Sequence, residues 1–216
     1  MSARIGPNAI LQLAGVLARE AGSDAAHAVF LAAGLRHHLD APPTSMVPEE
    51  DVIALYAALG KAMGPTRAAA LARAAGLATA EYLLAHRIPA AAKWTIAVLP
   101  ARWGCRLLCG AIARHAWTFV GGGAFEWRLG ADLELTIRDS PFARGRRTAS
   151  PVCDFYAGTF EGLFRALIDR RARATETQCA ATGAPVCRFT VEGLDARRRR
   201  FAAAVSAPFG GVRALD

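Results

Sequence analysis

Residues 117–137, WTFVGGGAFEWRLGADLELTI, decide the fold class of this chain. Apolar residues alternate with polar or small ones in Trp117–Val120, Phe125–Leu129 and Leu133–Ile137, and glycine-containing turns separate the three segments. Such alternation, with aromatic and β-branched residues, is typical of half-buried strands. The stretch therefore predicts three consecutive strands of an antiparallel meander.

Before this stretch, prolines divide the chain into helices. Pro48 precedes three acidic residues, which indicates a helix start because proline fits the first turn and acids suit the helix dipole. Pro65 opens an alanine-rich segment whose apolar residues recur at near-helical spacing. The predicted helices span residues 8–20, 23–38, 48 onward, 65–86 and 102–115, with a short segment between Pro89 and Pro100.

After the stretch, Ser150-Pro151 predicts the start of a helix that runs to about Arg171. Two more strands, Thr175–Ala180 and Val186–Val191, follow, joined by turn-forming residues. The fold class is α+β: an N-terminal helical layer, then an antiparallel sheet with an inserted helix and a terminal hairpin. We expect a helical region over residues 1–90 packed on a domain over residues 91–195, and a basic tail over residues 196–216.

The composition excludes several classes of protein. With 53% hydrophobic residues the chain is too apolar to be disordered, and its 216 residues suffice to bury a core. Every long apolar stretch carries a charge or a proline, so no membrane-spanning helix is predicted. Gly6-Pro7-Asn8 indicates a helix start rather than a secretory leader. We expect a cytoplasmic protein.

The formal net charge is +8, and 24 of the 26 basic residues are arginine. The densest basic runs are residues 144–147 and 197–200. Such runs can bind nucleic acid or an anionic surface, but like-charge blocks are also typical of solvated loops and tails. Because no nucleic-acid-binding motif accompanies them, we expect no nucleic-acid partner.

The glycine run Gly121-Gly122-Gly123 is a candidate phosphate-binding loop. Such a loop must lead from a strand into a helix, whose N-terminus then faces the phosphates. This run leads instead into the predicted strand Phe125–Leu129, so we interpret it as a turn. We expect no nucleotide or flavin cofactor site, and no residue order supports hydrolase chemistry.

The five cysteines are an odd number with no expected secretory leader, which predicts reduced thiols. Cys105 and Cys109 share one helix face, whereas Cys179 and Cys187 flank the terminal hairpin. Thiolates brought together suit zinc, so zinc is a possible cofactor, with Cys179 and Cys187 as the favoured ligands. The alternative is that these cysteines are small apolar residues of the core.

His115 lies at the predicted helix-to-strand junction, followed by Trp117 and Phe119. A histidine with two alternating aromatic residues can provide the axial ligand and the stacking wall for a planar, metal-bearing macrocycle. Ligand carboxylates could pair with Arg102, Arg106 or Arg114. Alternatively, the histidine only satisfies carbonyl groups at the helix end. His86 has the same position and the same two interpretations.

The motif Tyr156-Ala157-Gly158-Thr159-Phe160-Glu161-Gly162, followed by Glu176-x-x-Cys179-x-x-x-Gly183-x-x-x-Cys187-x-Phe189, resembles the 4-vinyl reductase domain. Residues 4–9 (RIGPNA), 85–89 (AHRIP) and 115–119 (HAWTF) are similar to the bacteriochlorophyll-biosynthesis branch of that family in purple phototrophic bacteria. The resemblance covers the chain up to the basic tail. It implies a ligand-binding fold shared with haem-based nitric-oxide sensors and vesicle-tethering subunits.

The resemblance also implies a role in making bacteriochlorophyll. We expect an accessory protein that binds a magnesium porphyrin or chlorophyllide intermediate and delivers it between the enzymes of the pathway. In this hypothesis His115 ligates magnesium, and His86 is the second candidate ligand. The pocket is lined by Trp117 and Phe119. The propionates pair with Arg87 or Arg114.

Two alternatives remain open. The family name implies an 8-vinyl (4-vinyl) reductase of divinyl protochlorophyllide or chlorophyllide, although hydride delivery requires a cofactor held against the substrate. The second alternative is a pigment- or metal-sensing regulatory scaffold. Besides a tetrapyrrole and the biosynthetic enzymes, the expected partners include a second copy of the chain in a homodimer. A peripheral position at the photosynthetic membrane is compatible with each of these roles.

Overall fold

The computed structural model describes residues 3–194, so the predicted basic tail lies outside the described residues. The helices are α1 (Asn8–Glu20), α2 (Ser23–Ala32), α3 (His37–Asp40), α4 (Glu49–His86), α5 (Ala90–Val98), α6 (Ala101–Arg114) and α7 (Asp154–Leu167), with the 3-10 helices η1 (Ala116–Thr118) and η2 (Ala180–Thr182). The strands are β1 (Arg4–Ile5), β2 (Val47–Pro48), β3 (Ala124–Leu129), β4 (Leu133–Arg138), β5 (Arg173–Gln178) and β6 (Cys187–Glu192).

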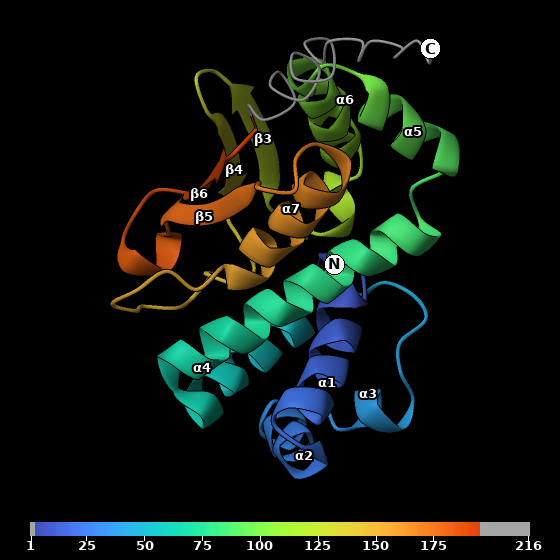
Figure 1. Cartoon of the computed structure of the whole chain (residues 1–216). Helices are drawn as coiled ribbons and strands as arrows, with labels where there is room; N and C mark the ends of the chain where they lie inside the picture. The colour runs from blue at the N-terminus through green and yellow to red at the C-terminus, as the bar shows by residue number, and fades with distance from the viewer. Residues whose placement is uncertain (1–2, 195–216) are drawn as a thin grey trace, which may run out of the picture.

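The main sheet has the strand order β3-β4-β6-β5, and each neighbouring pair is antiparallel. Helix α7 is inserted between β4 and β5 in sequence, and the helical layer precedes the sheet (Figure 1). The predicted α+β class, with its inserted helix and terminal hairpin, is therefore confirmed. The short strands β1 and β2 form a separate antiparallel pair.

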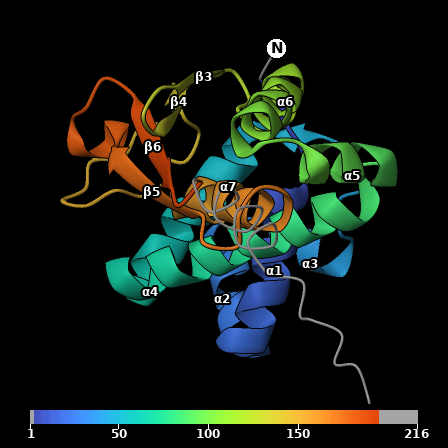
Figure 2. The same ribbon diagram turned by 45° about the horizontal axis from the view of Figure 1, so that its top comes forward.

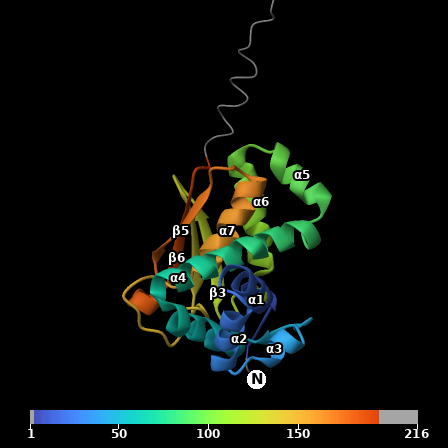
Figure 3. The same cartoon turned by 60° about the horizontal axis from the view of Figure 1, so that its bottom comes forward.

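Helix α7 is the centre of the fold, lying between the sheet and α4 (Figures 2 and 3). Its crossing with α4 is close because Gly158 lies against the backbone of Arg73, and Gly76 lies against the backbone of Phe155. On its other side, the buried residues of the central strands alternate with half-buried ones and are paired across the sheet, as Leu135 is with Phe189. One face of the sheet is thus buried by α7.

The prediction that Pro65 starts a new helix is confirmed in detail. Residues 49–86 are continuous by hydrogen bonding, but Gly64 has φ 73° and ψ 163°, which is not helical. The break falls directly before Pro65, because proline disfavours a helical conformation in the preceding residue. The helix starts at Asn8 and Glu49 also agree with the predictions from Pro7 and Pro48.

One predicted strand and two predicted helices differ clearly from the structure, whereas the strand predicted over Thr175–Ala180 is shifted by two residues, to Arg173–Gln178. Trp117–Val120 is not a strand: the chain continues α6 in tight turns, with the amides of Thr118 and Phe119 each 2.9 Å from the carbonyls of His115 and Ala116. The helix predicted over residues 23–38 ends at Ala32, since Gly34 adopts a φ of 74° that terminates it.

The helix predicted from Ser150 to Arg171 covers only Asp154–Leu167. It ends early because the Asp169 carboxylate accepts a hydrogen bond of 2.9 Å from the backbone amide of Arg171. This local side-chain bond competes with the helix and turns the chain toward β5.

Candidate functional site

His115 lies exposed at the carboxyl end of α6, directly after the exposed Arg114. Its Nδ1 atom is 2.9 Å from the carbonyl oxygen of Ala111. Since a carbonyl oxygen only accepts, this contact places the proton of the neutral ring on Nδ1 and the lone pair on Nε2. Metal-ligating histidines are commonly oriented through one nitrogen in this way, so His115 can offer Nε2 to a metal.

His86 has the same arrangement at the end of α4, with Nδ1 3.1 Å from the carbonyl oxygen of Tyr82. The imidazole of His86 also stacks on the ring of Tyr82, with centroids 4.7 Å apart. The guanidinium of the exposed Arg87 lies 6.0 Å from the centre of the Tyr82 ring. The tyrosine covers one face of the imidazole. A planar ligand therefore has less access to His86 on that side.

The two predicted lining residues have different environments. The indole of Trp117 is 61% exposed and can present a face to a ligand. Phe119 is half-buried, with its ring centroid 5.7 Å from Phe125 and 6.0 Å from Tyr156. Phe119 therefore belongs to the aromatic wall beneath the junction, and Trp117 to its surface.

Three motifs that are far apart in the sequence meet at this junction. The backbone amide of Gly6 donates to the carbonyl of Thr118 at 2.7 Å, and the hydroxyl of Tyr156 donates to the carbonyl of Phe119 at 2.6 Å. The N-terminal segment and α7 thus fix the backbone of residues 115–119. His115 and Trp117 are presented on a braced turn.

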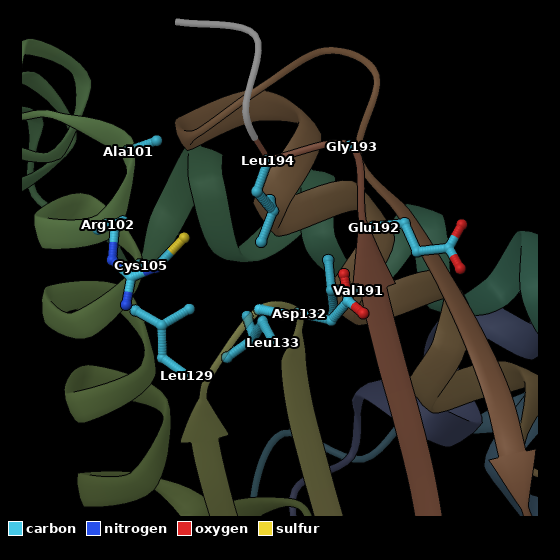
Figure 4. A pocket seen from close by; sticks show the side chains of 11 residues that line it. Ala101, Arg102, Cys105, Leu129, Asp132, Leu133, Val191, Glu192, Gly193 and Leu194 are labelled. Atoms are coloured by element: carbon cyan, nitrogen blue, oxygen red, sulfur yellow. The ribbon is translucent and has the colours of Figure 1, made fainter. Parts of the chain in front are cut away.

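Among residues 3–194, a small cavity and a groove lie away from the two predicted histidines. The cavity has a volume of about 50 Å³ and is lined by Arg102 and Cys105 of α6 and by Val191 and Glu192 at the end of β6, among others (Figure 4). A groove of about 380 Å³ lies between α4, the start of α7 and β5, lined by Pro65, Thr66, Ala69, Arg73, Ser150, Pro151, Asp154, Thr175 and Glu176. Only the groove reaches the size of ordinary small-molecule sites, about 300–1,000 Å³. The predicted histidines line neither hollow.

A cluster of metal-binding side chains lies where β5, β6 and the start of α7 meet. The three thiols of Cys153, Cys179 and Cys187 and a carboxylate oxygen of Glu176 are all within 4.8 Å of one another. The sulfurs of Cys153 and Cys187 are 3.5 Å apart. We call these four residues the Cys3Glu cluster.

The Cys3Glu cluster fits a tetrahedral zinc ion in donor type and number, since zinc takes thiolate sulfur and carboxylate oxygen. The carboxylate is oriented by the backbone amide of Cys153, which donates to Oε2 of Glu176 at 2.8 Å. Its other oxygen, Oε1, is buried and has no hydrogen-bond partner among residues 3–194. A buried oxygen of this kind is costly unless something binds it, and a metal ion would do so.

Protons are redistributed within the cluster. Burial, followed by the neighbouring Cys179, raises the pKa of Glu176 to about 8. Hydrogen bonds with Cys153 and Cys187 lower the pKa of the Cys179 thiol. Hydrogen bonds with Cys179 and Cys187, followed by burial, raise the pKa of the Cys153 thiol. The protein groups alone thus hold protons that a bound cation would displace.

The sequence pattern predicts two of the four residues of this cluster. Cys179 and Cys187 were predicted as ligands and lie together, whereas Cys105 and Cys109 are buried on the inner face of α6 and take no part in it. Cys153 and Glu176 were missed. The spacing Glu176-x-x-Cys179 was available as a signal, but nothing local connects Cys153 to a hairpin more than twenty residues later.

The glycine run is a turn before a strand, as predicted, since it leads into β3. The amide of Gly122 donates to the Glu49 carboxylate at 2.9 Å, and the same carboxylate pairs with Arg144. The amide of Gly122 therefore already donates its hydrogen bond to the buried Glu49 and is not available to a phosphate. Arg144 of the basic run also pairs with Asp139 at 2.8 Å, so it is a structural residue rather than a solvated one.

Residues 133–193 match the model of the V4R domain, and this segment contains the whole Cys3Glu cluster. The chain is 44% identical over 186 residues to the bacteriochlorophyll synthase 23 kDa chain of Cereibacter sphaeroides. This alignment covers 86% of this chain and 89% of that protein. This chain belongs to the bacteriochlorophyll synthase 23 kDa chain family. The member from Rhodobacter capsulatus is 40% identical over 188 residues, covering 87% of this chain and 86% of that protein.

Membership in the bacteriochlorophyll synthase 23 kDa chain family supports a role in bacteriochlorophyll biosynthesis. Among solved structures, an H-NOX protein from S. oneidensis in the Fe(II)NO ligation state aligns with a TM-score of 0.54 at 11% identity, covering 87% of this chain and 98% of that protein. The expected likeness to the fold of haem-based nitric-oxide sensors is confirmed. Within residues 3–194, no helix is long and apolar enough to cross a membrane.

Proposed function

We propose that this protein is an accessory protein of bacteriochlorophyll biosynthesis that binds a magnesium tetrapyrrole intermediate and delivers it between pathway enzymes. The observation that carries the proposal is His115, whose Nδ1 is held by the Ala111 carbonyl so that Nε2 can ligate a metal. Membership in the family supports the assignment to bacteriochlorophyll biosynthesis.

The surroundings of His115 suit a carrier. Trp117, two residues later, offers an exposed indole for contact with the macrocycle, and Arg114 offers a guanidinium for a propionate. Because both side chains lie at the surface, a ligand held there can be passed on without opening the core. His86 with Arg87 is a second such position, at the end of α4.

The proposal is tested by titrating the full chain with magnesium protoporphyrin and with divinyl protochlorophyllide, following Soret absorbance with and without NADPH. We expect a saturable shift that does not depend on NADPH. Loss of the axial ligand in His115→Ala should raise the Kd about tenfold or more while the unfolding midpoint stays unchanged. His27→Ala is the matched control, since His27 is exposed on α2 and bonds the Ser23 carbonyl through Nδ1 in the same way.

Unchanged pigment affinity in both His115→Ala and His86→Ala would overturn the assignment of the site. NADPH-dependent conversion of the divinyl to the monovinyl spectrum over many turnovers would replace the carrier with a reductase. The absence of any shift with either pigment would reject tetrapyrrole binding.

We also propose that the Cys3Glu cluster holds one zinc ion that braces the terminal hairpin against the start of α7. The support is the donor set and the orphaned Oε1 of Glu176. Elemental analysis of the purified protein should find one zinc per chain, lost in Cys179→Ser and kept in Cys105→Ser, whose thiol is buried on α6. A protein that takes up no zinc, or equal loss in both variants, would contradict this.

A further inference from the structure

Helices α5 and α6 form an outer pair that exposes large apolar side chains to solvent. Their inner side is buried through Ile96, Cys105, Leu108 and Cys109. Their outer side carries two pairs of large apolar residues, each pair four residues apart: Trp94 and Val98 are 68% and 55% exposed, and Trp103 and Leu107 are 59% and 45% exposed. Residues four apart lie on one helix face, so each helix is apolar on both its inner and its outer side.

The segment that contains both helices carries basic side chains and no acidic one. Residues 82–125 contain no Asp or Glu, and they carry the five basic residues Arg87, Lys93, Arg102, Arg106 and Arg114. The guanidinium of Arg106 lies 5.3 Å from the centre of the Trp103 ring, which places a cation beside an exposed indole. We call Trp94, Val98, Trp103 and Leu107, with the exposed Arg102 and Arg106, the α5–α6 surface. The half-buried Lys93 is not part of it, because its ammonium group donates to the carbonyl of Leu84 at 2.9 Å.

The α5–α6 surface is accessible from outside the molecule. Helices α5 and α6 lie at the end away from α1, α2 and α3 (Figures 1 and 3). The two helices pack against each other, so the two exposed apolar pairs lie on neighbouring helices. Large exposed apolar groups on neighbouring elements are typical of an interaction site, since water-exposed apolar area is unfavourable. The two helices themselves carry arginines and no acidic side chain, which favours a negatively charged partner, although Arg102 also faces a cavity lined by Asp132 and Glu192.

We propose that the α5–α6 surface docks this protein onto an anionic lipid bilayer. Tryptophan prefers the boundary between water and acyl chains, and arginine binds the anionic headgroups beside it. Helices with apolar and basic residues together lie in the plane of this boundary rather than across it. Because no helix in residues 3–194 can span a membrane, the contact is with the membrane surface. Docking by this surface does not depend on pigment binding at His115.

The test is sedimentation of the pigment-free full chain with vesicles of phosphatidylglycerol or of phosphatidylcholine. We expect binding to the anionic vesicles that weakens with added salt, and little binding to phosphatidylcholine. The double variant Trp94→Ser, Trp103→Ser should lower the vesicle affinity about tenfold or more. Leu31→Ser is the matched control, because Leu31 is 64% exposed on α2 and should leave the affinity unchanged.

Each other result overturns the proposal. Anionic-vesicle binding that is unaffected by the double variant would place the contact elsewhere, for example on residues 195–216, which every variant retains. Absence of binding to either vesicle would exclude a lipid partner. If vesicles do not bind and the double variant instead changes the sedimentation mass of the free protein, the surface is an interface between two copies of the chain.

Discussion

Glu161 of α7 is buried, and its carboxylate joins three parts of the chain. It pairs with Arg73 of α4 and with Arg165 of its own helix, the latter at 2.8 Å, and it accepts a hydrogen bond of 3.2 Å from the backbone amide of Ala174 in β5. A buried charge is tolerated only when it is paired and hydrogen-bonded. This residue of the family motif therefore serves the packing of the domain.

The substitution Glu161→Gln should destabilise the protein by about 1.5–3 kcal/mol, because it weakens charged hydrogen bonds to a buried group. Denaturant unfolding followed by circular dichroism measures the change. The control Glu126→Gln removes an exposed ion pair between Glu126 of β3 and Arg138 of β4 and should leave stability unchanged. Equal effects of the two substitutions would show that burial of Glu161 does not matter.

At the scale of elements, the crossing of α4 and α7 explains the glycines of the same motif. A Cβ at Gly158 would overlap the carbonyl of Arg73, and one at Gly162 would press on Ala80. Glycine in a helix costs about 1 kcal/mol relative to alanine. The motif retains it at Gly158 because a larger residue would push the two helices apart.

Gly158→Ala should therefore destabilise the protein by about 1–3 kcal/mol through overpacking, despite its better helix propensity. Gly15→Ala in α1 is the control: a Cβ there meets nothing within 4 Å, so this variant should be slightly more stable. Thermal unfolding of both variants checks the sign. A stabilised Gly158→Ala variant would show that the helices can separate without cost.

At the scale of the whole molecule, the helical layer and the sheet are joined on both sides of α7. Glu49 and Tyr156 tie the junction around η1 to the start of α4 and to α7. At the β5–β6 side, the Cys3Glu cluster links the start of α7 to the hairpin. A bound zinc ion would add a crosslink where the backbone amides of Cys153 and Ala180 already contact cluster atoms.

Removal of zinc by a chelator should accordingly lower the stability of the whole domain. Binding to the native state alone contributes about 3–4 kcal/mol when free zinc exceeds its Kd by two to three orders of magnitude. For a chain of this size this corresponds to a fall in Tm of about 10 °C. Calorimetry with and without chelator, and after zinc is restored, measures it. An unchanged Tm in protein shown to have lost its zinc would mean that the ion does not brace the fold.

The sequence by itself determined the class of most long elements and most helix starts. Pro7, Pro48 and Pro65 fix φ locally and lack an amide hydrogen, so their effect does not depend on distant residues. The alternation in β4 and β6 likewise predicted strands, because one face of a strand must be buried. Local rules also placed His86 and His115 at the ends of α4 and α6.

Only the tertiary structure decided which of these pieces meet. Trp117–Val120 has the pattern of a strand, yet the end of α6 and the bonds from Gly6 and Tyr156 hold this segment in turns. Cys153 joins Cys179 and Cys187 because α7 packs on the hairpin, and Cys105 faces a different part of the core. Spacing along the chain sets local conformation, but contacts between distant residues follow from how the buried faces of α4, α7 and the sheet cover one another.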